Sequence, residues 1–104
     1  MIYSTTETIP GRKIAEIKGV VTGNVVQSKH IGRDFMAGLK SIVGGEIRGY
    51  TEMMTEARNI AIQRMVEDAA NMGADAVVGI RFTTSSIVDG SSEILAFGTA
   101  VKLV

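Results

Sequence analysis

His30 is the residue of this sequence best suited to acid–base chemistry or metal binding near neutral pH. It is the only histidine of the chain, and an imidazole is the one side chain whose ordinary pKa lies between pH 5 and 8. Lys29, Arg33 and Asp34 lie within four residues of it. Two interpretations stand side by side: a ligand-binding or acid–base residue at the end of a strand, or a loop histidine satisfied by backbone carbonyls or packed at an interface.

A second candidate site is the Gly44-Gly45-Glu46 segment, which precedes a predicted helix. Free N–H groups at the N-terminus of a helix can bind an anion. The segment lacks both the phosphate-loop pattern that ends in Gly-Lys-Ser/Thr and the dinucleotide pattern GxGxxG, so a simple helix break is the alternative. The candidate ligand-binding residues are therefore Lys29, His30, Arg33 and Glu46.

Metal binding meets an obstacle in the composition of the chain. Soft heavy metals prefer thiolates, and structural zinc sites use sets of Cys or His, whereas this chain has no cysteine and a single histidine. The metal ligand that remains is His30, with carboxylates or with symmetry-related copies of His30 gathered around an axis. No other cofactor is indicated. Three of the six methionines fall on the apolar stripe of the predicted helix and are expected to fill the core; these are Met54, Met65 and Met72.

The composition also argues against several classes of protein. Eleven Lys and Arg balance eleven Asp and Glu, and only 5% of the residues are aromatic, so the chain lacks the basic excess typical of nucleic-acid binding. No stretch approaches the roughly 18 apolar residues of a membrane span, and no signal peptide is visible. Together with the lack of cysteine, these features predict a cytoplasmic protein.

One long amphipathic helix is predicted from Thr51 to Ala74, and the same pattern would allow a start as early as Glu46. Its apolar residues recur mostly at steps of three and four, the period of a helix with one buried stripe; they are Met54, Ala57, Ile60, Ala61, Met65, Ala69 and Met72. Glu52 and Glu56 are expected in the first turns, where the helix dipole favours negative charge. Gly73 is expected to end the helix in the left-handed conformation.

Three long strands are predicted, over Lys13–Val26, Ala76–Ser86 and Ser92–Leu103. Asp89-Gly90 is typical of the tight turn of a hairpin, and Ile2–Thr8 is predicted as an edge strand. In the first long strand every second residue is small or apolar, which predicts one face buried against a helix layer; these residues are Ala15, Ile17, Gly19, Val21, Gly23 and Val25.

The elements predict a single α+β domain over residues 1–104. The last strand is apolar on both faces and is placed between the other two, which gives an antiparallel three-stranded sheet of order 1-3-2. The long helix and a shorter helix over Arg33–Val43 are expected on one face. The opposite face is predicted to be too apolar for water, and a subunit contact is expected to cover it; its predicted residues include Val20, Val26, Val77, Ile94, Ala96 and Ala100.

Four stretches, which together span most of the chain, carry a resemblance to a known family: TTETIPGRKIAEIKGVVTGNVVQSKHIGRD, SIVGGEIRGYTEM, GADAVVGIRFTTSSI and FGTAVKL. They resemble the YbjQ family of small bacterial proteins. The resemblance implies a fold similar to the dodecin subunit and a ring-like homopentamer, and the family is labelled as heavy-metal-binding. It implies no catalytic residues and no substrate.

Three functions are therefore considered. The first is a non-enzymatic cytoplasmic homopentamer with a small-ligand or partner role at its subunit interfaces. The second is a binding module for a metal or a small anion, centred on His30 with Lys29 and Arg33. The third is a hydrolase or isomerase that uses His30 with Asp34 or Glu46, which requires these groups within hydrogen-bond reach of a substrate.

Overall fold

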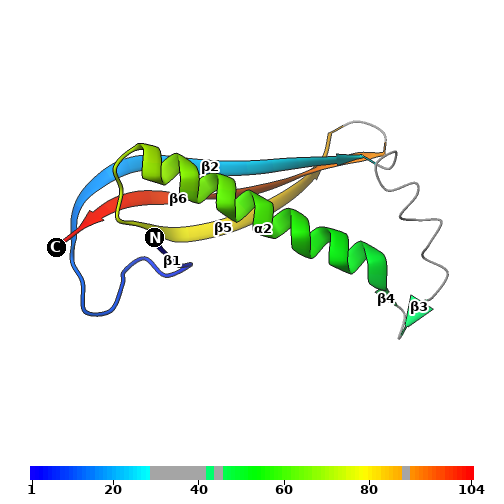
Figure 1. Cartoon of the computed structure of the whole chain (residues 1–104), viewed down its shortest axis with the longest axis horizontal. Coiled ribbons are helices and arrows are strands. Elements are labelled where there is room, and N and C mark those ends of the chain that lie inside the picture. The colour runs from blue at the N-terminus through cyan, green and yellow to red at the C-terminus, as the bar shows by residue number, and fades with distance from the viewer. Residues whose placement is uncertain (29–41, 44–45, 88–89) are drawn as a thin grey trace.

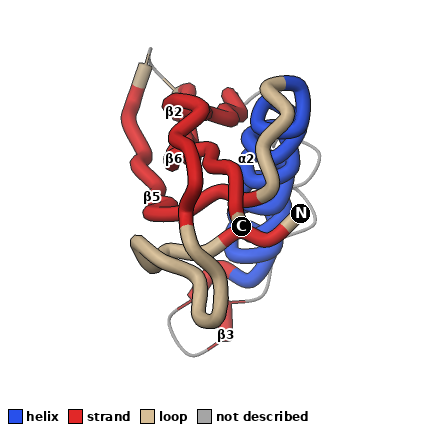
Figure 2. The backbone as a smooth tube through the Cα atoms, turned by 90° about the vertical axis from the view of Figure 1, so that its left-hand side faces the viewer, coloured by secondary structure: helices blue, strands red, loops and turns tan. Residues whose placement is uncertain are grey.

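The protein folds into one helix packed on one face of a sheet, as the computed structural model shows for residues 1–28, 42–43, 46–87 and 90–104 (Figures 1 and 2). The helix is α2 (Arg48–Asn71). The main sheet has the strand order β1-β5-β6-β2, and its strands are β1 (Ile2–Tyr3), β2 (Ile14–Ser28), β5 (Ala76–Ser86) and β6 (Ser91–Leu103). The predicted α+β architecture is confirmed.

The three long strands have the predicted order, with β6 in the centre and antiparallel to both neighbours. The prediction of a three-stranded, wholly antiparallel sheet is nevertheless wrong, because β1 adds a fourth strand parallel to β5. The backbone of Ser4 extends this pairing: its N–H donates to the carbonyl oxygen of Val77 at 3.0 Å, and its carbonyl accepts from Ile80 at 3.1 Å. The chain then bends over residues 5–8, so the edge strand is much shorter than the predicted Ile2–Thr8.

Helix α2 begins at Arg48, three residues before the predicted Thr51. A start at Glu46 is not possible because Glu46–Ile47 forms the short strand β4. This early start leaves no acidic residue in the first turn, so the expectation that Glu52 and Glu56 lie in the first turns and favour the helix dipole is wrong.

The C-terminal end of α2 and its buried stripe follow the prediction closely. Gly73 has a φ of 75°, and the N–H of Ala74 donates to the carbonyl of Ala69 at 3.1 Å, as a left-handed helix end requires. The fully buried residues of the stripe recur at steps of four and are Ala57, Ala61, Met65 and Ala69. Met72 lies beyond the helix and is 36% exposed, so its assignment to the core stripe is wrong.

The predicted short helix over Arg33–Val43 falls largely outside the described residues. Its last two residues are described, and they form strand β3 (Ile42–Val43), which pairs antiparallel with β4. Ile and Val are β-branched and favour a strand where a partner is at hand. For these two residues the helix prediction is wrong.

A break in the alternation of β2 decides which of its residues contact the helix. The register of β2 against β6 shifts between Ile17 and Gly19, and such a bulge moves all following side chains to the other face. Val21 and Val25 pack against α2 as predicted, whereas Ile17 lies opposite Val101 on the other side of the sheet and is 69% exposed. The placement of Ile17 on the helix face is therefore wrong.

The sheet surface that faces away from α2 is here called the second face, and its membership differs from the prediction. Val20 and Val26 are exposed on it, at 71% and 54%. Four residues assigned to it instead pack in the core with α2, namely Val77, Ile94, Ala96 and Ala100. Both sides of β6 are apolar, so alternation alone could not tell its two faces apart, and a register shift after Val78 changes the facing of β5.

One end of the second face is covered by the chain itself. A small cluster of buried residues lies there, with Ile9 of the N-terminal segment packed against it; the cluster consists of Ala76, Val78, Val101 and Leu103. The remainder of this face has no covering layer within the described part of the chain.

Candidate functional site

The ligand site predicted from the sequence lies almost entirely outside the described residues. Lys29, His30 and Arg33 belong to the stretch that the structure leaves out, as does Asp34. Glu46 lies in β4, and only its backbone is described. The structure neither brings these residues together nor separates them, so the site remains a prediction.

The described residues offer no metal site of their own. Among residues 1–28, 42–43, 46–87 and 90–104, no group of three or more His, Asp or Glu side chains is placed so that it could hold an ion.

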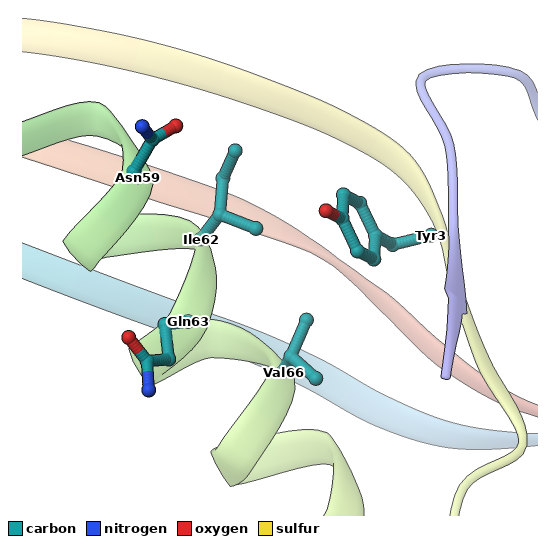
Figure 3. A pocket seen from close by; sticks show the side chains of 5 residues that line it. All are labelled: Tyr3, Asn59, Ile62, Gln63 and Val66. Carbon is teal, nitrogen blue, oxygen red and sulfur yellow. The ribbon is translucent and has the colours of Figure 1, made fainter. Parts of the chain in front are cut away.

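A groove of about 310 Å³ lies between β1 and α2 (Figure 3). The ring of Tyr3 faces the aliphatic side chains of Ile62 and Val66, and Asn59 and Gln63 of α2 complete the lining, with the carboxamide of Gln63 pointing away from Tyr3. Such a lining can pack against an apolar group and hydrogen-bond to a polar group beside it, but it carries no carboxylate, imidazole or ammonium group for acid–base work near neutral pH.

A second hollow, of about 320 Å³, lies on the second face beside the N-terminal segment. Its floor is apolar, with Ile17 and Val101 among the lining residues, and Glu7 is the only charged residue of its lining. Both hollows are near the lower limit of the volumes usual for small-molecule sites. Neither resembles a catalytic centre.

Asp75 is a carboxylate with a structural role. Asp75, just before β5, accepts a hydrogen bond from the backbone N–H of Leu103 at 2.9 Å and from Lys102 Nζ at 3.2 Å. The Leu103 N–H, then the Lys102 side chain, lower the pKa of Asp75 below its ordinary value. These contacts tie the start of β5 to the end of β6, so Asp75 serves the fold.

The most conspicuous surface is a row of exposed aliphatic side chains along β2. They are Ile14, Ile17, Val20 and Val26, at 37%, 69%, 71% and 54% exposure, and we name them the second-face patch. Exposed aliphatic side chains scattered singly are ordinary on a protein surface, whereas several on one face of a sheet make that face a candidate interaction site; on β2 the exposed Thr22 and Asn24 lie between Val20 and Val26.

Two further residues act on the same strand and were not predicted from the sequence. They are Arg64 and Asp68 of α2. In the structure both side chains reach the backbone of β2, at Asn24 and Thr22. Their opposite charges at a spacing of i and i+4 were the available signal, although the same spacing is also common on solvated helix surfaces.

The fold and its surfaces define a small α+β protein in which, among the described residues, several aliphatic side chains are exposed on the second face of the sheet. The chain belongs to the YbjQ family: the family model described as "Putative heavy-metal-binding" matches residues 1–104. The resemblance noted from the sequence is thereby confirmed. No helix within the described ranges is long and apolar enough to span a membrane.

Relatives from distant bacteria match the chain from end to end. A UPF0145 protein of Vibrio campbellii is 96% identical over 104 residues and covers 100% of both chains. A UPF0145 protein of Thermotoga maritima is 61% identical over 103 residues, covering 99% of this chain and 97% of the relative. These names state no activity.

A solved structure supports the fold. The crystal structure of a Pediococcus pentosaceus protein of unknown function, assigned to the DUF74 family, has a TM-score of 0.66 and 18% identity, and the match covers 100% of this chain and 98% of that one. At this identity the likeness concerns the fold alone.

Proposed function

We propose that this protein is the subunit of a homo-oligomeric assembly in which neighbouring copies cover the second-face patch. The observation that carries the proposal is the exposure of Val20 at 71% and Ile17 at 69%, on a strand that belongs to the well-packed part of the fold. Side chains of this kind are usually found in a core or an interface.

The energies indicate how large the contact must be. Burying one fully exposed Val or Ile side chain contributes about 1.5–3 kcal/mol, so covering the 54–71% of Ile17, Val20 and Val26 that is exposed supplies roughly 3–6 kcal/mol in total. Association costs an estimated 4–15 kcal/mol in lost freedom of motion. The three residues alone therefore bring association only to about break-even, and a stable assembly must also bury their surroundings on the second face.

The number of five subunits is part of the proposal and rests on the family resemblance. A ring arises when one surface of each copy contacts a different surface of the next, and the rotation closes. A cytoplasmic location, predicted from the composition, is part of the same proposal.

A ligand role would fit the same contact. The hollow beside Glu7 opens on the second face, so in an assembly it would lie at or near a subunit boundary. An apolar floor with one carboxylate suits a small apolar compound that carries a positive charge.

The assembly is tested by light scattering coupled to size-exclusion chromatography. The expected molar mass is a multiple of 11.1 kDa that does not change on dilution. A mass of 11.1 kDa at all concentrations would refute the proposal.

The alternative function is a metal- or small-anion-binding module centred on His30, with Lys29, Arg33 and Glu46. It is favoured by the description of the matching family model. Calorimetric titration with zinc and with phosphate, on the wild-type chain and on His30→Ala, discriminates the two functions. Binding that disappears in the variant supports the module, and the lack of binding in the wild-type chain refutes it.

A further inference from the structure

Strand β2 forms one outer edge of the main sheet, since the order is β1-β5-β6-β2. It is 15 residues long, and within the described ranges its backbone pairs with β6 and with no other strand. A long edge strand with apolar side chains readily pairs with the strand of another molecule and polymerises, unless something covers its free backbone groups.

Two side chains of α2 reach this free edge. Arg64 Nη1 donates to the carbonyl oxygen of Asn24 at 2.6 Å, and Asp68 Oδ2 accepts from the backbone N–H of Thr22 at 3.4 Å. Residues four apart on a helix project from the same flank, and residues two apart on a strand direct their backbone groups to the same side. Arg64 and Asp68 are therefore spaced along α2 so that each can reach one of the two backbone groups, at Asn24 and Thr22, on the edge of β2.

The two contacts differ in strength but act together. A guanidinium that donates to a carbonyl at 2.6 Å is a short, charge-assisted hydrogen bond, whereas the contact of Asp68 is longer and weaker. An incoming strand would have to displace both side chains before it could use the N–H of Thr22 and the carbonyl of Asn24. These two residues lie at the middle of the run from Val20 to Val26, between its exposed valines.

We infer that Arg64 and Asp68 close the outer edge of β2 to strand addition by a second copy of this chain. The same strand offers a second copy two ways to bind, through its apolar face and through its backbone edge. With the edge closed, a copy contacts β2 through the second-face patch, which permits a finite assembly. The use of the patch rests on the proposed function; the closure of the edge does not.

The test is the double variant Arg64→Ala/Asp68→Ala, compared with the wild-type chain by light scattering over a tenfold range of protein concentration. We expect the mass of the variant to rise by about twofold or more over that range as strands add to the open edge, while the mass of the wild-type chain stays constant. A variant whose mass equals that of the wild-type chain throughout overturns the inference.

The matched control is Arg58→Ala/Glu67→Ala. It removes the same two kinds of charge from exposed positions of the same helix, and the hydrogen bond recorded for Arg58 is to Thr55 of α2. We expect its mass to equal that of the wild-type chain. If it grows with concentration as the first variant does, loss of charge explains the effect and the inference fails.

A second measurement covers the case in which the double variant does not fold. Hydrogen exchange of the Thr22 amide is compared between the wild-type chain and the single variant Asp68→Ala, with Glu67→Ala as control. We expect exchange about threefold or more faster in Asp68→Ala alone. An unchanged rate would show that Asp68 does not protect this edge. If the wild-type chain proves monomeric, the proposed assembly fails, while the exchange result still decides whether the edge is closed.

Discussion

Gly23 of β2 lies directly against the backbone of Ala61 in α2. A Cβ atom at Gly23 would overlap with the carbonyl oxygen of Ala61 and with the backbone nitrogen of Met65. Neither atom belongs to a side chain that can turn away. The close approach of helix and sheet, and with it the position from which α2 reaches the edge of β2, therefore depends on the lack of a side chain at Gly23.

The first prediction concerns this contact. Gly23→Ala is expected to lower the free energy of unfolding by about 3 kcal/mol, because overpacking against backbone forces the helix away from the sheet. Gly98→Ala is the comparison, since its Cβ would lie 2.8 Å from the side-chain atom Val77 Cγ1 and no closer than 3.0 Å to a backbone atom, the carbonyl oxygen of Val78, whereas at Gly23 both close contacts are to backbone. Urea unfolding should rank Gly23→Ala as clearly the more destabilising; the reverse ranking would contradict the packing described.

The second prediction separates two methionines of the predicted stripe. Met65 is fully buried, whereas Met72 is 36% exposed. Met65→Ala should cost about 2–5 kcal/mol through lost burial and a residual cavity, and Met72→Ala should stay within about 1 kcal/mol of the wild-type chain. Thermal and urea unfolding of both variants measure the difference. An equal loss of unfolding free energy in the two variants would show that Met72 is packed as well as Met65, contrary to the structure.

The third prediction is the pH dependence carried by Asp75. The Leu103 N–H and the Lys102 ammonium hold its pKa in the folded chain below the ordinary value of 3.8. The carboxyl group of Asp75 thus binds a proton less readily in the folded chain than in the unfolded chain. The stability that its ionised form contributes is therefore fully present above about pH 4 and is lost as the pH falls through the lowered pKa.

Urea unfolding of the wild-type chain and of Asp75→Asn tests this sign. The wild-type chain should be the more stable at pH 7, and the difference in free energy of unfolding between the two chains should become smaller below pH 4. A gap that widens as the pH falls would mean that the pKa of Asp75 is raised instead.

The fourth prediction tests the second-face patch. Ile17→Asp should shift the assembly toward single chains, because a subunit contact would have to bury a carboxylate in place of an aliphatic side chain. The free energy of association should fall by at least about 2 kcal/mol per subunit contact, which raises the dissociation constant by a factor of roughly 30. Sedimentation velocity over a dilution series measures the shift. Val104→Asp, at a position 73% exposed, is the control and should sediment like the wild-type chain.

Much of the fold follows from local pattern. Steps of three and four predicted α2, and Gly73 marked its end, since both signals arise from residues near one another in the sequence. The two-sided apolar character of β6 predicted its central place. The parallel pairing of β1 did not follow, because two residues carry no pattern and their partner lies more than seventy positions away.

The second face could be predicted to exist, but its members could not be named. The bulge near Gly19 and the register shift after Val78 each reverse the facing of the residues beyond them. A glycine signals that a bulge is allowed and does not say that one forms. The roles of Arg64 and Asp68 were missed for a related reason: their partners are backbone atoms of Asn24 and Thr22, which no side-chain pattern reveals.

The most direct test of the covered face uses the lack of cysteine in this chain. Val20→Cys and Val104→Cys each introduce a single thiol at a position that is 71% or 73% exposed in the isolated subunit. In chains whose mass matches the wild-type assembly, we predict that a maleimide labels Val20→Cys at least about tenfold more slowly than Val104→Cys, since a neighbouring copy covers the second face. Equal labelling rates would contradict the account.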